Sequence, residues 1–319
     1  MPTISPISSH LLPYTLDNNI AVVSLADADP AAEAATTAHG TLVSEHRLSP
    51  FIVLSLFNTL TELERNPEVH CLVVTGGTGK FFCNGFDLKF IHANRATPNL
   101  VDDLQQATEQ LLALLLKFRK PTVAAVNGHA AAAGAMLLLA FDKVVMNNER
   151  GYCFVPGVDL GIVYSPGMTA LMAAKLPVQM RTDFIVFGKR YGATELEANG
   201  VLLGATKERV MPEAMKIAQD LKKKAAFPEA LGRIKECLYH EACAALECEI
   251  DESIFNPIYK PMGFGNMNPS VDKPKEAAPQ VQQATIESKR RSTLVATQIE
   301  SNATILNLSM RLATTEEGA

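Results

Sequence analysis

A run of alanine and glycine, residues 130–135, follows a short apolar segment and Asn127-Gly128 and could let a ligand approach the main chain. Residues 72–91 are built similarly, with an apolar run, a glycine-containing turn and then a helix-like segment. Helix N-termini leave backbone N–H groups without partners and carry partial positive charge, so each turn could hold an anion or a polarised carbonyl oxygen. Two such donors, meeting at the carboxyl ends of parallel strands, would form an oxyanion hole.

The same run of small residues has a structural explanation. Alanine and glycine at 130–134 could simply let a helix pack closely on a sheet, and spacing alone favours that interpretation. On the residues alone both explanations stay open.

Other kinds of site find little support. The cysteines lack any C-x-x-C pair, so they indicate neither a zinc site nor a disulfide framework, and we expect reduced thiols. No His, Asp or Cys cluster has metal-ligand spacing, so no metal is expected. The stretch Gly76 to Lys80 misses the phosphate-loop spacing because Phe81 and Phe82 follow the lysine.

Composition excludes further classes of function. The chain has 319 residues, 47% hydrophobic and 20% charged, with a net charge of −5. No basic stripe appears, so nucleic acid is not an expected partner, and no apolar run is long enough for a membrane span. The first Lys or Arg is Arg47, and the chain ends in TTEEGA, which is not a peroxisomal address. We expect a cytoplasmic protein by default.

The elements that must position these turns alternate along the chain. Strand-like segments at 20–27, 70–77, 121–127 and 143–147 are separated by helix-like ones, the first starting at Pro50 with Ser49 as its cap. Strands separated by helices predict an α/β fold with a mostly parallel sheet.

Four regions are predicted from composition and pattern. They are an N-terminal lead (1–19), a core that carries the site (20–192), a helical C-terminal part (193–250), and a Pro-rich linker and tail that we expect to be poorly ordered (251–319).

Several motifs together resemble the enoyl-CoA hydratase/isomerase (crotonase) superfamily. GKFFCNGFDLKFI and KPTVAAVNGHAAAAGAMLLLAFDKVVM are similar to the segments that carry its two oxyanion donors. HRLSPFIVLSLFNTLTELE and RGYCFVPGVDLGIVYSPGMTALMAAKL are similar in particular to the Δ3,Δ2-enoyl-CoA isomerase branch. The likeness covers residues 20 to 220 and implies a crotonase-like spiral of ββα units with a helical C-terminal part that forms trimers.

The resemblance implies an acyl-CoA thioester as ligand. Its carbonyl oxygen would lie between the backbone amides of Phe86, which follows Asn84-Gly85, and of Ala133, which precedes Gly134. Removing a proton beside a thioester builds an enolate whose charge sits on that oxygen, so donors there act most in the transition state. The remaining CoA moiety would lie along Arg47, Leu48, Asp87 and Leu88. Arg47 could pair with a phosphate, although a surface arginine at a helix start explains it equally.

The proton-transfer groups depart from the family pattern. Hydratases of the family use two glutamates, and the matching positions hold Met136 and Gly157; isomerases keep only the second. Asp159, two residues on, is a weak candidate base, because residues two apart on an extended segment share a face. His129 fits the turn as a structural, hydrogen-bonding histidine.

The resemblance implies isomerisation of 3-enoyl-CoA to trans-2-enoyl-CoA in fatty-acid oxidation, by a homotrimer or hexamer. No cofactor is expected, because coenzyme A is part of the substrate, and the family function would also allow a peroxisomal location. A catalytically impaired acyl-CoA-binding homologue, or another reaction through a thioester enolate, is the alternative.

Overall fold

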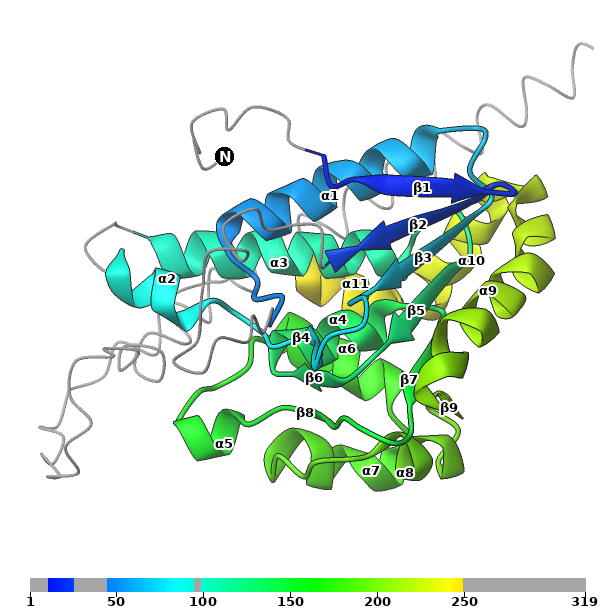
Figure 1. Ribbon diagram of the computed structural model, residues 1–319. Helices are drawn as coiled ribbons and strands as arrows, with labels where there is room; N and C mark the ends of the chain where they lie inside the picture. Colours follow the sequence, from blue (N-terminus) through cyan, green and yellow to red (C-terminus); the bar gives the residue numbers. More distant parts are fainter. Residues whose placement is uncertain (1–10, 26–44, 95–98, 249–319) are drawn as a thin grey trace, which may run out of the picture. The chain divides into compact units, whose positions relative to one another are not determined.

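Two sheets form the framework of the protein in the computed structural model (Figure 1). The model describes residues 11–25, 45–94 and 99–248, all within the first of the two units into which the chain divides, Met1–Gly265. The larger sheet has the order β1 (Tyr14–Asp17), β2 (Ile20–Ser24), β3 (Cys71–Thr75), β5 (Thr122–Val126), β7 (Lys143–Asn147) and β9 (Leu203–Ala205). The smaller sheet has the order β4 (Phe81–Cys83), β6 (His129–Ala131) and β8 (Cys153–Phe154).

Helices follow or separate the strands. They are α1 (Pro50–Arg65), α2 (Leu88–Ala93), α3 (Leu100–Leu116), α4 (Ala133–Ala140), α5 (Gly157–Leu160), α6 (Pro166–Lys175), α7 (Val178–Arg181), α8 (Ala193–Ala198), α9 (Val210–Leu221), α10 (Pro228–Leu238) and α11 (His240–Glu247). A π-helical turn (Thr182–Val186) and two 3-10 segments (Lys207–Arg209 and Lys222–Ala226) complete the set in the described residues. None of these helices has the length and hydrophobicity that crossing a membrane requires.

The two sheets are built by three consecutive repeats. Strands β3, β5 and β7 of the larger sheet lead into β4, β6 and β8 of the smaller sheet, and a helix follows each pair. Pairing between β2, β3, β5, β7 and β9 is parallel, as is pairing within the smaller sheet. This arrangement is the predicted spiral of ββα units.

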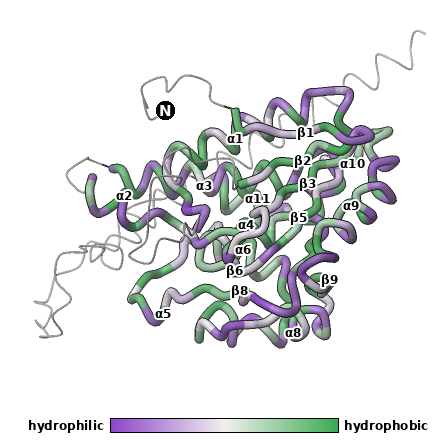
Figure 2. The backbone as a smooth tube through the Cα atoms, in the orientation of Figure 1, coloured by the Kyte–Doolittle hydropathy of each residue, from purple (hydrophilic) through white to green (hydrophobic). Residues whose placement is uncertain are grey.

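Alternate residues of the central strands face two different cores. Val73 and Val123 belong to a small core on the face covered by α9, where Ala214 and Ala218 pack. Val74 belongs to the main core on the other face, which contains residues of α1, α3 and α4. In Figure 2 the central strands are mainly hydrophobic, and hydrophilic residues lie on outer turns such as those of α9. Strands buried on both faces fit a parallel sheet covered by helices on each side.

Two short strands differ from the sequence-based expectations. β1 lies in the predicted N-terminal lead, yet it pairs antiparallel with β2 and extends the sheet. β9 lies in the part expected to be helical and pairs with β7. Its few residues carry no readable periodicity, so the pattern could not separate a strand from a helix.

The predicted start of the first helix, at Pro50 with Ser49 as its N-cap, is confirmed. Ser49 Oγ accepts a hydrogen bond from Ile52 N at the N-terminus of α1.

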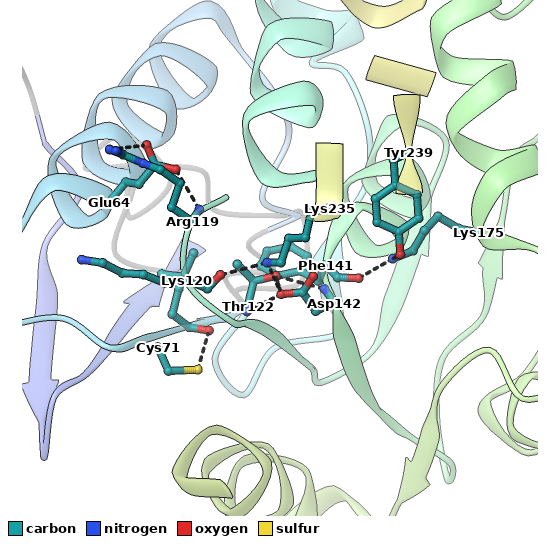
Figure 3. A network of polar contacts seen from close by, with 11 residues as sticks. Glu64, Cys71, Arg119, Lys120, Thr122, Phe141, Asp142, Lys175, Lys235 and Tyr239 are labelled. Carbon is teal, nitrogen blue, oxygen red and sulfur yellow. Dashed lines mark hydrogen bonds and ion pairs between the residues drawn. The ribbon is translucent and has the colours of Figure 1, made fainter. Parts of the chain in front are cut away.

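A buried ionic network ties α10 to the start of β5 and β7 (Figure 3). The Asp142 carboxylate accepts from Thr122 N at 2.8 Å, from Thr122 Oγ1 at 3.1 Å and from Lys235 Nζ at 2.5 Å. Lys235 Nζ also donates to the Lys120 carbonyl at 2.9 Å. Burial lowers the pKa of Lys235, and Asp142 opposes that shift. Asp142 therefore compensates a charge that would otherwise be buried alone.

Asp142→Asn should destabilise the protein by about 3–5 kcal/mol, because it leaves the Lys235 ammonium without its counter-charge. The measurement is urea unfolding at neutral pH. Asp17→Asn, at an exposed position of β1, is the matched control and should change stability by less than about 0.5 kcal/mol. Equal losses in both variants would contradict this account of the network.

Candidate active site

The first predicted donor, the amide of Phe86, lies in an extended turn just after β4. Leu48 forms a parallel bridge with Phe86. In this bridge Leu48 N donates to the Gly85 carbonyl at 2.8 Å, and Asp87 N donates to the Leu48 carbonyl at 3.1 Å. In a parallel bridge of this kind, the residues on either side of the central one make the hydrogen bonds to the partner strand, and the central residue's own N–H points away from that strand. The Phe86 N–H therefore points away from Leu48.

The second predicted donor, the amide of Ala133, opens α4. Ala132 N donates to the Phe154 carbonyl at 3.0 Å, which fixes the start of α4 beside β8. Ala132 itself has φ 52° and ψ −126°, a backbone conformation that suits glycine. The first N–H groups of a helix have no acceptor within the helix. Within the described part of the chain, neither the Ala133 nor the Phe86 amide donates to a protein carbonyl.

Glycine at two positions allows these turns to touch through their backbones. A Cβ added to Gly85, whose φ is +73°, would lie 2.9 Å from Ala132 Cβ and 3.4 Å from Ala133 N. A Cβ added to Gly134 would lie 2.2 Å from the Cys83 carbonyl oxygen. The run of small residues thus serves close packing of α4 on β4, and the same packing sets the Phe86 and Ala133 turns side by side. That both amides donate to one thioester oxygen stays a prediction.

The predicted CoA contacts lie next to this pair of turns. Asn84 N donates to the Glu45 carbonyl at 3.0 Å, and Leu48 is fully buried. The Arg47 guanidinium forms an ion pair with Glu45 at 2.5 Å and donates to the Phe86 carbonyl at 3.4 Å. A phosphate would therefore meet an arginine that already has a carboxylate partner.

Asp87 and Leu88 form the start of α2. The Asp87 side chain accepts from Lys89 N at 3.1 Å and from Phe90 N at 3.0 Å, so it caps the helix. Leu88 is 36% exposed. The side chain of Asp87 has a structural role, and a contact between this backbone and adenine remains a prediction.

The two positions that the resemblance matches to the hydratase glutamates hold no proton carrier of their own. Met136 is 2% exposed and packs in the main core. Gly157 opens α5, and the space that its side chain would need is occupied: a Cβ there would lie 2.3 Å from the Tyr164 hydroxyl oxygen and 2.7 Å from the Ile162 carbonyl oxygen. Gly157 N donates a hydrogen bond to the Tyr164 hydroxyl. Sequence reasoning did not identify Tyr164, since no periodicity links it to Gly157.

Residues 157–160 form a helical turn and not the extended segment assumed for Asp159. In a helix, residues two apart point about 200° from each other, so Asp159 does not share a face with Gly157. Asp159 is exposed, and one of its carboxylate oxygens lies 3.7 Å from where a Cβ on Gly188 would be. Its role as a base stays an untested prediction with less geometric support than before.

His129 contacts the backbone rather than any acidic partner. Its Nδ1 lies 3.2 Å from Tyr152 N, which donates to it, and its ring lies between the rings of Phe81 and Tyr152. An Nδ1 that accepts requires a neutral imidazole. Burial lowers the pKa of His129, and the nearby Lys80 and arginines add to that shift. These contacts fit the structural role expected for His129.

A separate cavity of about 620 Å³ lies at the amino ends of β7 and β9, opposite to the turns described above. Lys175 Nζ, at its wall, donates to the Phe141 carbonyl at 2.8 Å and to the Tyr239 hydroxyl at 3.3 Å (Figure 3). Burial lowers the pKa of Lys175 to about 8. In the described residues no group of three or more His, Cys, Asp or Glu side chains could hold a metal ion.

Comparison with known proteins connects this geometry to a family. The sequence model of the enoyl-CoA hydratase/isomerase family matches residues 47–255. The chain belongs to the enoyl-CoA hydratase/isomerase family. Peroxisomal enoyl-CoA delta isomerase 2 of Arabidopsis thaliana is 31% identical over 212 residues, 64% of this chain and 88% of that relative. Enoyl-CoA delta isomerase 3 of the same plant is 31% identical over 208 residues, 64% of this chain and 87% of that relative.

Solved structures agree on the fold. A probable enoyl-CoA hydratase from Mycobacterium tuberculosis superposes with a TM-score of 0.64 at 24% identity, covering 77% of this chain and 95% of that one. The relatives confirm the predicted likeness to the isomerase branch of the family, and the structure confirms the crotonase-like fold.

Gly85→Ala should destabilise the protein more than Gly200→Ala does. Both glycines have φ +73°, so both variants carry the strain of an alanine in the left-handed region, about 1–2 kcal/mol. Nothing lies within 4 Å of a Cβ at Gly200, whereas a Cβ at Gly85 crowds the start of α4, which adds about 1–3 kcal/mol. Thermal and urea unfolding of the two variants measure the difference. Equal destabilisation would show that the two turns are not in close contact.

His129→Asn should remove a pH dependence of stability. The pKa of His129 is lower in the folded protein than its ordinary value near 6.5, so unfolding takes up a proton between the two values. The free energy of unfolding therefore falls as the pH is lowered through that interval and keeps its full value above it. Urea unfolding across this range tests the expectation, and an unchanged pH dependence in His129→Asn would contradict it.

Proposed function

We propose that the protein is an acyl-CoA isomerase of the crotonase type that converts 3-enoyl-CoA to trans-2-enoyl-CoA in fatty-acid oxidation. The observation that carries the proposal is the contact between the turns of Phe86 and Ala133, whose amides have no protein acceptor among the described residues. The two Arabidopsis relatives are named enoyl-CoA delta isomerases, which supports isomerisation of an enoyl-CoA.

The chemistry needs these amides at one step. Removal of a proton from C2 of the substrate moves negative charge onto the thioester oxygen, and protonation at C4 then completes the shift of the double bond. Two backbone donors stabilise that charge, and loss of one such donor typically costs about 10²- to 10³-fold in rate. The remaining CoA would lie along the Arg47–Leu48 and Asp87–Leu88 segments.

Hydration by the paired-carboxylate route has no support from the residues present. Met136 is buried and has no acidic proton, and Gly157 has no side chain. The isomerase reaction needs only one proton carrier, so it demands less of this site. The same replacements support the alternative function, an acyl-CoA-binding homologue that has lost its turnover.

Assembly, cofactors and location are part of the proposal. We expect a homotrimer or hexamer, since crotonase relatives are expected to assemble through the C-terminal helical part, and no cofactor apart from the CoA of the substrate. Enoyl-CoA delta isomerases 1 and 2 of Arabidopsis thaliana are named as peroxisomal, which makes the peroxisome the proposed compartment.

The deciding experiment measures turnover of the purified protein on a medium-chain trans-3-enoyl-CoA, beside hydration of the trans-2-enoyl-CoA. We expect isomerisation without hydration. Gly85→Ala should lose activity and Gly200→Ala should keep it, because only the former crowds the predicted donors. Tight calorimetric binding of CoA thioesters without turnover would overturn the isomerase proposal in favour of the binding homologue, and absence of binding would overturn both.

A further inference from the structure

Tyr164 takes the space that a side chain at Gly157 would otherwise fill. A Cβ on Gly157 would lie 2.3 Å from the Tyr164 hydroxyl oxygen and 2.4 Å from its Cζ atom. The tyrosine thus brings a titratable oxygen to the direction in which a residue at position 157 would project. Gly157 N donates to that oxygen, which fixes it there.

This position is close to the predicted oxyanion donors. Ala131 of β6 is paired with Phe154 of β8, and the Phe154 carbonyl accepts from Ala132 N, the residue before the second donor. Gly157 follows Phe154 by three residues, which span at most about 11 Å. That the hydroxyl reaches C2 and C4 of a thioester held by the Ala133 amide is part of the proposal that the experiment below tests.

The loop that carries Tyr164 is held at both ends. Ile162 N donates to the Gly157 carbonyl at 2.8 Å, closing the turn that begins at Gly157. Ser165 is buried, and its Oγ accepts from Met168 N at 3.0 Å as the N-cap of α6. The ring of Tyr164 packs, partly buried, against the main core. A phenol held in this way can act on one defined point of a ligand.

The protonation state follows from the surroundings. Burial raises the pKa of Tyr164, the hydrogen bond from Gly157 N opposes that rise, and the charge of Asp159 adds to it. At neutral pH the side chain is a neutral phenol whose oxygen accepts from Gly157 N and whose proton can be donated to a ligand. The phenolate is scarce but is a stronger base than a carboxylate.

We propose that the Tyr164 hydroxyl is the catalytic group that carries the proton from C2 to C4 of a bound 3-enoyl-CoA. This inference rests on the proposed function. The phenolate oxygen takes the proton from C2, and the electron pair of that C–H bond forms a dienolate with its charge on the thioester oxygen. The phenol then gives the same proton to C4, the double bond lies between C2 and C3, and the phenolate is regenerated.

A phenolate base predicts a distinctive pH profile. Its population rises tenfold per pH unit below its pKa, so the rate should rise by about tenfold per unit from about pH 6 to pH 9. Carboxylates ordinarily titrate near pH 4, so a carboxylate base would give a flat profile over the same interval. The profile therefore separates the two candidate bases without any substitution.

The test uses the full chain and two readouts. One is turnover of trans-3-enoyl-CoA; the other is exchange of the C2 protons of a saturated acyl-CoA for deuterium in D₂O, which needs the base and the donors but no double bond. Tyr164→Phe keeps the ring and should lower kcat and exchange by about 10²- to 10⁴-fold with little change in the calorimetric Kd, and it should abolish the pH slope. Tyr14→Phe, in β1, is the matched control and Asp159→Asn tests the rival base.

The outcomes distinguish this inference from the proposed function. Unchanged turnover and slope in Tyr164→Phe would overturn the role of Tyr164 while the isomerase function stands. If the protein shows no isomerase turnover but exchanges the C2 protons for deuterium, and Tyr164→Phe abolishes that exchange, the role of Tyr164 as proton carrier would be supported and the isomerase function overturned. A protein that binds acyl-CoA with neither turnover nor exchange would overturn both.

Discussion

The contact between the Gly85 turn and the first residues of α4 is the constraint on which the arrangement of the site depends. Two backbones approach closely here, because a Cβ at Gly85 would meet Ala132 at the start of α4 and a Cβ at Gly134 would meet Cys83 at the end of β4. The smaller sheet sets this approach by pairing β4 with β6. Asn127 Nδ2 strengthens it by donating to the Gly79 and Phe81 carbonyls at 2.7 and 3.0 Å. A family that holds a thioester oxygen by main-chain amides needs this proximity before any other feature.

The main-chain and side-chain parts of the predicted site match the family resemblance to different degrees. The backbone around Phe86 and Ala133 fits the family pattern, even though Ala132 stands in a conformation that costs a non-glycine residue about 1–3 kcal/mol. The two positions that the resemblance matches to the hydratase glutamates hold Met136, in the core, and Gly157. Tyr164 occupies the space that a side chain at Gly157 would need.

Sequence reasoning succeeded where a pattern extends over many residues. Alternating strands and helices predicted β3, β5 and β7, the family resemblance implied the ββα order, and Ser49-Pro50 marked the start of α1. It failed for β1 and β9, because so few residues show no period. Asp159 was misplaced since one helical turn cannot be told from an extended segment, and Tyr164 was missed because its approach to Gly157 depends on how a loop closes. Periodicity describes elements, whereas this loop is fixed by tertiary contacts.

Because the two predicted donors are peptide N–H groups, they belong to no side chain. Alanine scanning would leave both in place, and a comparison of side chains at 86 and 133 carries little information about whether a relative retains them. Only replacement of the peptide link itself by an ester, which has no N–H, would remove one donor while leaving the fold's side chains intact. In this protein, Gly85 and Gly134 allow the backbones that carry the two amides to approach each other. Substitutions at these two positions in a relative would therefore indicate whether that relative retains the pair of donors.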